Sequence, residues 1–201
     1  MTADPLERVL AGLSAPLAPS SDYDLNPDVN LPKGRSLRPA GVLVPVEMTD
    51  SGAKLWLTKR SSALKHHPGQ VAFPGGKQDD TDTDITATAL REASEEIGLA
   101  PDNVEVLGQL PSHETVTSFI VTPVIGRIRA PFELRPEAGE VEEAFAVPLA
   151  HVLDPARFSV QSRRWRGTRR HYYTVPFGPY YIWGATARIL RALAEAVRST
   201  R

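Results

Sequence analysis

The chain has 201 residues, of which 41% are hydrophobic and 23% charged, and its net charge is −1. This length is sufficient for one well-packed domain and short for two. The balanced charge excludes a polyelectrolyte binder, and the absence of cysteine excludes disulfides, zinc-thiolate sites and cysteine nucleophiles. No apolar run approaches the ~18 residues of a membrane span, and the N-terminus does not look like a cleaved signal. We therefore expect a soluble, cytoplasmic protein without a membrane partner.

The N-terminal segment differs in composition from the rest of the chain. Asp4-Pro5 is typical of a helix start, and the apolar residues that follow share one helix face: Leu6, Val9, Leu10 and Leu13. Five prolines then occur between residues 15 and 39, among Ser, Asp and Asn, which favours an extended wrap. We predict an N-terminal helix and Pro-rich extended arm at residues 1–38 and a single domain at 39–201.

The middle of the chain is predicted to be rich in strands. Residues 41–46 and 54–59 flank the turn Asp50-Ser51-Gly52 and predict a hairpin. A short strand at 70–73 leads into Pro74-Gly75-Gly76. Further strands are predicted at 104–110, 119–128 and 141–147, and Pro123 inside the second of these favours an edge position or a bulge.

The C-terminal part begins with a short turn or helix at 148–153 and a basic hairpin with arms at 158–165 and 171–175. The hairpin carries the one basic, aromatic-bearing cluster, formed by Arg163, Arg164, Trp165, Arg166, Arg169, Arg170 and His171. Such a cluster is compatible with nucleic-acid binding, but a solvated hairpin with alternating arginines is the simpler interpretation. A terminal helix follows at 185–197. The pattern predicts an α/β (α+β) fold with a mixed β-sheet between helices.

One predicted helix, at residues 86–97, concentrates negative charge on one face. Glu92, Glu95 and Glu96 are spaced i, i+3 and i+4, so their carboxylates fall within an arc of roughly 100°. The opposite face is an apolar stripe, and Gly98 is placed for a left-handed helix end. A solvated acidic face is one interpretation. The other is a site for a hard divalent cation, Mg²⁺ or Mn²⁺.

The same stretch resembles the Nudix box. The family pattern is Gly, five residues, Glu, seven residues, then Arg-Glu-apolar-any-Glu-Glu-any-Gly-apolar. This chain matches it with Gly76, Asp82 and the run Arg91-Glu92-Ala93-Ser94-Glu95-Glu96-Ile97-Gly98-Leu99. Asp82 stands where Glu is usual, and one extra residue precedes Arg91. The resemblance implies a Nudix-type α/β/α sandwich and a metal-dependent hydrolase of a nucleoside diphosphate linked to another moiety.

With both departures, the box of this chain resembles that of the coenzyme A pyrophosphatase branch of the family. A second signature supports this branch: Leu57-Thr58-Lys59-Arg60-Ser61, Lys65, Gly69 and Phe73-Pro74-Gly75-Gly76. Trp56 replaces a Leu of that signature, and Lys65 replaces an Arg, which gives a point charge and not a bidentate fork. Residues 140–149 and 181–190 also look like this branch. The implied reaction splits coenzyme A or its thioesters into 3′,5′-ADP and (acyl-)4′-phosphopantetheine.

The resemblance also implies roles for individual residues. Glu92 and Glu96 are the expected metal ligands, Glu95 acts directly or through a water, and the Gly75 carbonyl adds an oxygen. For the general base we prefer Glu140 to Glu143, because Glu140 precedes its strand and should lie in a loop.

Three cations upstream of the glycines, Lys59, Arg60 and Lys65, are expected to contact the phosphates of the substrate. Arg91 is expected to pair with Asp82 and hold the loop against the helix. His113 and Glu114 are weaker candidates for the general base, and we expect them in a surface loop.

Other functions are compatible with parts of the pattern. A Nudix pyrophosphatase for ADP-ribose, a dinucleotide or an oxidised nucleotide is an alternative that the Lys65 substitution leaves open. A non-catalytic Nudix-fold binding module is expected to lose box acids, which this chain retains. RNA binding or decapping through the basic hairpin is the fourth interpretation. The leading prediction is a coenzyme A-like small-molecule substrate with Mg²⁺ or Mn²⁺, no nucleic-acid partner, and a chain compatible with a homodimer.

Overall fold

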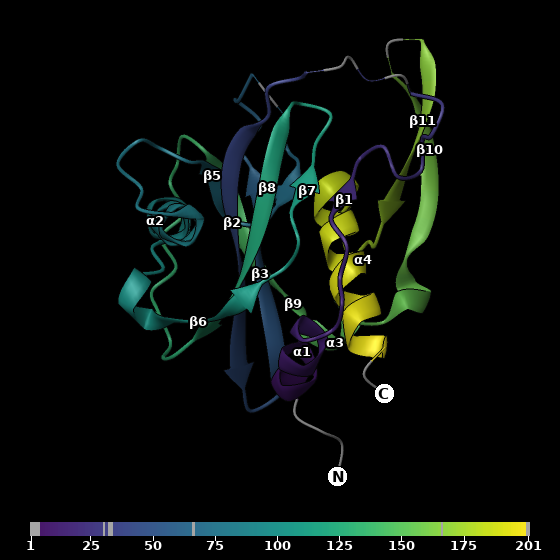
Figure 1. Ribbon diagram of the computed structural model, residues 1–201. Coiled ribbons are helices and arrows are strands. Elements are labelled where there is room, and N and C mark those ends of the chain that lie inside the picture. The colour runs from purple at the N-terminus through teal and green to yellow at the C-terminus, as the bar shows by residue number, and fades with distance from the viewer. Residues whose placement is uncertain (1–4, 30, 32–33, 66, 166, 200–201) are drawn as a thin grey trace.

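The computed structural model describes residues 5–29, 31, 34–65, 67–165 and 167–199, with the side chain of residue 165 left out (Figure 1). Its elements, in chain order, are α1 (Pro5–Leu13), β1 (Ser20–Ser21), β2 (Arg38–Thr49), β3 (Gly52–Arg60), β4 (Val71–Ala72), β5 (Gly75–Lys77), α2 (Ile85–Ile97), a 3₁₀ turn (Pro101–Asn103), β6 (Val104–Gln109), β7 (His113–Glu114), β8 (Phe119–Ile128), β9 (Val141–Pro148), α3 (Leu149–Val152), a second 3₁₀ turn (Pro155–Arg157), β10 (Ser159–Trp165), β11 (Thr168–Thr174) and α4 (Gly184–Ser199).

A mixed sheet of nine strands forms the body, in the order β1-β7-β8-β2-β3-β4, with β5 on β2, β6 on β8 and β9 on β3. The two long central strands, β2 and β8, run parallel, from Arg38 opposite Phe119 to Glu47 opposite Ile128. The expected hairpin is confirmed, because β2 and β3 pair antiparallel around Ser51.

Helices cover both faces of this sheet, with α2 on one side and α4 with α1 on the other (Figure 1). Adjacent residues of the central strand therefore point into different cores. Leu43 packs in the core under α2, and Val44 packs in the core under α4, and both are fully buried. This alternation is the consequence of the strand period of two. The predicted mixed sheet between helices is confirmed.

The acidic helix α2 has a clear signal at each end. The Asp84 side chain accepts a hydrogen bond from the Ala87 N–H and so caps the first turn. Gly98 ends the helix in the left-handed region, at φ 76°, and its N–H bonds to carbonyls of the last turn. Glycine adopts this conformation without the penalty that a Cβ brings. The expected helix end at Gly98 is confirmed.

The N-terminal helix α1 is packed into the core of the body. Leu6 and Val9 are buried in the core that contains α4, while the neighbouring Leu10 is 40% exposed. The arm that follows adds β1 to the edge of the sheet, parallel to β7. No helix within the described ranges is long and apolar enough to cross a membrane.

Of the two expectations for Pro123, the edge position is wrong, whereas the pairing of β8 with β6 does contain a bulge-like register shift, between Val106 and Gly108. Strand β8 lies inside the sheet, with β2 on one side and β6 and β7 on the other. Pro123 lies between the segment of β8 that pairs with β7 and the segment that pairs with β6. There only its carbonyl is used, as the acceptor for the Leu110 N–H at 2.9 Å. The missing N–H of proline therefore leaves no gap in the ladder.

The predicted basic hairpin is confirmed as a two-stranded antiparallel sheet of its own, with Ser159 opposite Thr174 and Trp165 opposite Thr168. It stands beside α4, away from α2 (Figure 1). Residue 166, one of the arginines of the cluster, lies outside the described residues.

Candidate active site

Strand β5 passes over the acidic face of α2 and brings two glycines against its carboxylates. The Gly75 N–H donates to Oε2 of Glu96 at 3.3 Å. A Cβ added to Gly76 would lie 2.6 Å from the carboxylate of Glu92. A side chain at position 76 would therefore displace the carboxylate of Glu92 from its present place. The structure makes these residues a strand paired with β2, beyond the short strand that was predicted at 70–73.

Glu96 is the most deeply buried carboxylate of the site, with only 5% of its surface exposed. Burial, followed by repulsion from Glu92, raises its pKa to about 8, although the Gly75 N–H and the positive charge of Arg60 act in the opposite direction. Burial also raises the pKa of Glu92, against the opposing effect of Arg91. Because both carboxyl groups resist ionisation, the site favours a ligand that brings positive charge.

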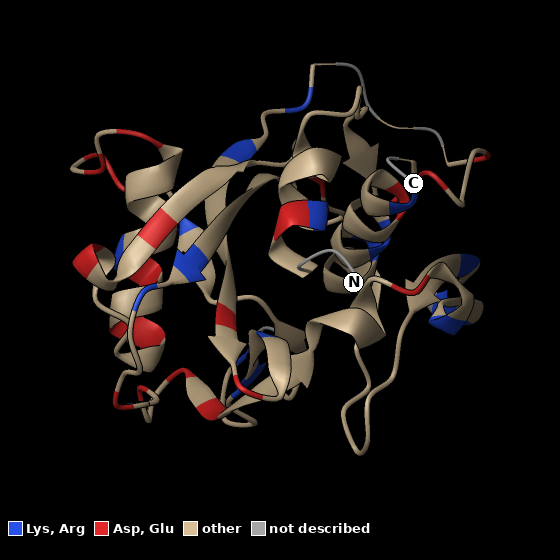
Figure 2. Cartoon of the chain, turned by 90° about the horizontal axis from the view of Figure 1, so that it is seen from below, with Lys and Arg blue, Asp and Glu red and all other residues tan. Residues whose placement is uncertain are grey.

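Arg91 is the centre of an ion-pair network on the outer side of the helix. Its guanidinium donates to both oxygens of Asp82, at 2.9 and 3.0 Å, which gives the expected pair of loop and helix. Nη1 of the same guanidinium lies 3.0 Å from Oε1 of Glu92 and 2.9 Å from Oε2 of Glu95. Glu95 follows Arg91 by four residues, one turn along the helix. The hydrogen bonds from Arg91 hold the pKa of Asp82 well below its usual range. Figure 2 shows the acidic segments gathered on α2 and on the loop before it.

The same carboxylates have the donor atoms that a divalent cation requires. Their oxygens suit a hard ion such as Mg²⁺, and Glu96 has the burial and raised pKa that a bound cation would relieve. However, no three His, Asp or Glu side chains among the described residues are placed as they stand to hold a metal. One reason lies in Arg91, which contacts Glu92 and Glu95. The donor chemistry fits a divalent cation, and in this structure Arg91 supplies the positive charge beside Glu92.

A downstream loop brings Glu140 to this cluster. The Glu137 N–H donates to the backbone carbonyl of Glu96 at 2.9 Å, so the loop docks on the last turn of α2. The Glu140 carbonyl accepts from the Ser61 N–H at 2.8 Å. The negative charge of Glu140 contributes to the raised pKa values of both Glu92 and Glu96. Glu143, the other candidate, points elsewhere and accepts a hydrogen bond from the Tyr180 hydroxyl.

The three predicted cations have different surroundings. Arg60 is close enough to Glu96 to lower its pKa, so it lies at the edge of the cluster. Lys59 pairs with Glu142, with 2.6 Å between Nζ and Oε1. Lys65 is exposed on the loop between β3 and β4. Arg60 is therefore the cation that the structure brings beside Glu96, whereas Lys59 is paired with Glu142.

The expectation that His113 and Glu114 belong to a surface loop is wrong. Both form strand β7, which lies between β1 and β8. His113 is completely buried, with Nδ1 2.9 Å from Oγ of Ser20 and Nε2 3.1 Å from Oδ1 of Asp22. Glu114 is paired with Arg35. The N-terminal arm covers this strand, which the local sequence around residue 113 did not indicate.

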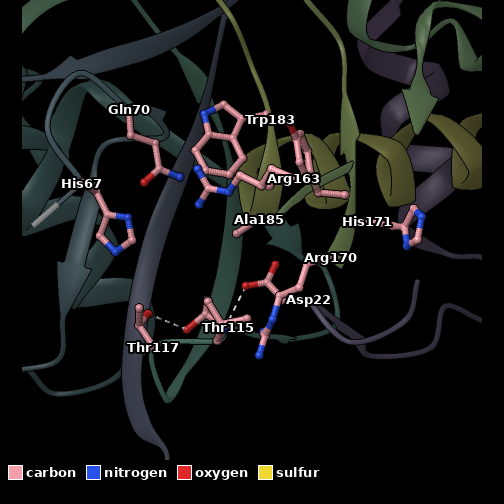
Figure 3. A pocket seen from close by; sticks show the side chains of 13 residues that line it. Asp22, His67, Gln70, Thr115, Thr117, Arg163, Arg170, His171, Trp183 and Ala185 are labelled. Atoms are coloured by element: carbon pink, nitrogen blue, oxygen red, sulfur yellow. Dashed lines mark hydrogen bonds between the residues drawn. The ribbon is translucent and has the colours of Figure 1, made fainter. Parts of the chain in front are cut away.

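A cavity of about 240 Å³, which was not predicted from the sequence, lies between the basic hairpin, the start of α4 and the turn after β7 (Figure 3). It is lined by residues from well-separated parts of the chain. The aromatic and basic residues of the hairpin were the one signal that pointed to it.

Comparisons with known proteins agree with this geometry. The family model described as NUDIX domain matches residues 37–168, more than half of the chain. A protein of Cronobacter sakazakii named uncharacterized Nudix hydrolase NudL is 43% identical over 157 residues, which cover 78% of this chain and 81% of that protein. The protein of the same name from Shigella flexneri is 42% identical over 163 residues, covering 81% and 84%.

Two solved structures are also similar. A binary complex of the Ap4A hydrolase of C. elegans has a TM-score of 0.48 at 16% identity, covering 55% of this chain and 80% of that one. The MutT protein of Methanosarcina mazei has a TM-score of 0.47 at 20% identity, covering 61% and 84%. The family assignment rests on the family model and on the two relatives. The chain belongs to the Nudix family and is a Nudix hydrolase, a pyrophosphatase of a kind that generally uses divalent metal ions.

Proposed function

We propose that this enzyme hydrolyses the pyrophosphate bond of coenzyme A or its thioesters, giving 3′,5′-ADP and 4′-phosphopantetheine or its acyl form. The observation that carries the hydrolytic part is the cluster of Glu92, Glu96 and Glu140 beside Gly75 and Gly76. The preference for coenzyme A is supported by the signature from Leu57 to Gly76, which precedes and enters the box.

Glu92 and Glu96 are the proposed ligands of Mg²⁺ or Mn²⁺, with Glu95 and the Gly75 carbonyl as further oxygens. The bound cation would polarise the phosphoryl oxygens and screen the charge of the pyrophosphate. Glu96 holds its position through the Gly75 N–H. Glu92 is held by Arg91, and the same guanidinium is anchored to Asp82 from the other side.

Glu140 is the proposed general base, because its loop is fastened to the last turn of α2 and its charge acts on both Glu92 and Glu96. In this role the Glu140 carboxylate takes a proton from the water that attacks phosphorus. Glu95 is proposed to assist as a second catalytic carboxylate. Arg60 is the best placed of the three cations to bind a substrate phosphate, with Lys59 and Lys65 as outer contacts.

A substrate panel tests this proposal. Coenzyme A, acyl-coenzyme A, ADP-ribose, NADH and nucleoside triphosphates are compared by kcat/KM with Mg²⁺ and with Mn²⁺, and the products are identified by chromatography. We expect coenzyme A or a thioester to rank first and to give 3′,5′-ADP. If ADP-ribose exceeds coenzyme A by tenfold or more, the substrate assignment is wrong, although the hydrolytic chemistry stands.

The assignment of the base has its own test. Glu140→Gln keeps the shape of the side chain and removes its ability to accept a proton, so we expect kcat to fall by about 10²–10⁴. Glu143→Gln is the matched control, since Glu143 is bonded to Tyr180. If the control loses as much activity as Glu140→Gln, the role proposed for Glu140 is wrong.

A further inference from the structure

The turn that ends at Glu140 is held by the residue that precedes it, Glu137. Residues 138–140 form this turn, directly before strand β9. The backbone N–H of Glu140 is shared between two acceptors of Glu137, the carbonyl at 3.1 Å and the carboxylate oxygen Oε2 at 2.8 Å. The same carbonyl accepts from the Val141 N–H at 2.8 Å, where β9 begins. The side chain of Glu137 therefore closes the turn over the backbone of Glu140.

The Glu137 carboxylate is folded back over this turn. A Cβ added to Gly139 would lie 3.0 Å from Oε2 of Glu137 and 3.4 Å from Oε1, so the glycine leaves room for the carboxylate. None of the ion pairs of the described residues involves Glu137, and Arg135, two positions before it, pairs with Glu133. A carboxylate that accepts from a backbone N–H forms a strong, charge-assisted hydrogen bond. The bond to the Glu140 N–H therefore accounts for the position of this side chain.

The backbone of Glu137 is attached to the helix of the box acids. Its N–H donates to the Glu96 carbonyl at 2.9 Å, and the Arg135 N–H donates to the Ile97 carbonyl at 3.0 Å. The last carbonyls of a helix have no partner inside the helix, so this loop satisfies two of them. Pro136, between the two donors, fixes its own φ and stiffens the connection. Glu137 thus joins the last turn of α2 to the turn of Glu140.

The loop after β3 holds Glu140 by its other backbone group. The Glu140 carbonyl accepts from the N–H of Ser61 at 2.8 Å, and Ser61 follows Arg60, the cation beside Glu96. Both the N–H and the carbonyl of Glu140 are therefore fixed. Its exposed carboxylate takes part in none of the hydrogen bonds and ion pairs of the residues that the structure describes. The arrangement fixes the backbone of this residue and leaves its carboxylate available.

We propose that Glu137 is a positioning residue of the hydrolytic reaction, because its carboxylate holds the backbone of Glu140 where the Glu140 side chain reaches the attacking water. This inference rests on the proposed function, since it takes Glu140 as the general base. In this role Glu137 transfers no proton and binds no metal. It acts through the hydrogen bond to the Glu140 N–H, which requires an oxygen acceptor and does not require the negative charge.

A double-mutant cycle in kcat tests this inference. Glu137→Ala removes the acceptor, and Glu137→Gln keeps an oxygen acceptor but removes the charge. Each is also combined with Glu140→Gln. The matched control is Glu133→Ala in the same loop, because the Glu133 side chain is 78% exposed and its partner is Arg135, at 3.6 Å. All variants are assayed with Mg²⁺ on the substrate that is hydrolysed fastest, and urea unfolding establishes that each is folded.

We expect Glu137→Ala to lower kcat by about 10–100-fold, as a misplaced catalytic group predicts, with KM changed by less than about twofold. Glu137→Gln should retain most of the activity, and Glu133→Ala should stay within about twofold of the wild type. In the Glu140→Gln background, Glu137→Ala should cause little further loss, because the base that it positions is no longer there. A purely structural role would instead lower kcat by the same factor in both backgrounds.

Three results would overturn the inference: equal losses in Glu137→Ala and Glu137→Gln, a loss in Glu133→Ala as large as that in Glu137→Ala, or losses that multiply in the double variant. The outcome is separable from the proposed function. If Glu140→Gln is impaired while Glu137→Ala has the kcat of the wild type, the base is assigned correctly and the role of Glu137 is wrong. If Glu140→Gln has the kcat of the wild type, the base is assigned wrongly and the role of Glu137 falls with it.

Discussion

Replacing Glu96 with Gln should make the metal-free protein more stable and, at the same time, inactive. Glu96 is 5% exposed, and it receives one hydrogen bond, from Gly75, that glutamine is equally able to accept. No arginine or lysine forms an ion pair with it among those that the structure describes. The ionised form is therefore disfavoured in the folded state, and the neutral amide removes this cost while it keeps the shape of the side chain.

The size of the effect follows from the pKa of Glu96, which rises from the ordinary value of 4.5 to about 8 on folding. Because the folded state holds its proton more tightly, the free energy of unfolding falls as the pH rises from about 4.5 to about 8. At about 1.4 kcal/mol per unit, the wild-type chain loses roughly 3–5 kcal/mol across this window. Glu96→Gln lacks that dependence and should match the wild type near pH 4.5 and exceed it by that amount above pH 8.

Urea unfolding in EDTA, repeated from pH 4.5 to 8.5, measures this difference. The matched control is Glu95→Gln on the same helix, because the Glu95 side chain is 58% exposed and its pair with Arg91 should contribute less than about 1 kcal/mol. The activity of Glu96→Gln should fall by orders of magnitude with Mg²⁺ present. A variant that is less stable than the wild type at pH 8.5, or a difference that does not grow with pH, would refute the reasoning.

Three further outcomes are expected. Val9→Ala should lower the free energy of unfolding in urea by about 2–3 kcal/mol, because Val9 is fully buried. Leu10 is 40% exposed, so Leu10→Ala should lower it by less than about 1 kcal/mol. Gly76→Ala should lower kcat/KM by about 10–100-fold with little change in the unfolding midpoint, since the added methyl displaces only the flexible end of Glu92. Mg²⁺ binding at pH 7 should release about one proton from Glu96, visible in calorimetry as a dependence on buffer ionisation enthalpy that vanishes at pH 9.5.

The elements that the sequence predicted correctly are those with local signals. The acidic helix has a side-chain cap at Asp84 and a glycine at its C-terminus, and the hairpin of β2 and β3 has a turn between two alternating runs. Strand β5 was missed because Gly75 and Gly76 have no strand preference of their own, and pairing with β2 places them. The edge position expected for Pro123 was wrong because its place in the sheet depends on where the neighbouring strands β6 and β7 begin and end.

The acidic residues of α2 were predictable because helical spacing alone puts them on one face. The position of Glu140 was not, since it depends on a loop whose Glu137 N–H docks on the backbone of Glu96. The buried environment of His113 was hidden for the same reason, because its partners Ser20 and Asp22 come from the arm. The cavity beside the hairpin likewise combines the arm, the turn after β7, the hairpin and the start of α4. Such long-range assembly leaves no periodic pattern in the sequence.

The three box carboxylates lie on one helix face but differ in environment, and Arg91 contacts two of them. Arg91 is the one cation that contacts two of them, Glu92 and Glu95, among the ion pairs of the described residues. Its other donors are occupied by the two oxygens of Asp82, which fix the guanidinium on the outer side of the helix. Glu96, on the inner side, therefore keeps its electrostatic cost. Asp82 thus anchors Arg91 beside Glu92 and Glu95, while Glu96, five residues from Arg91, lies on another side of the helix from that residue.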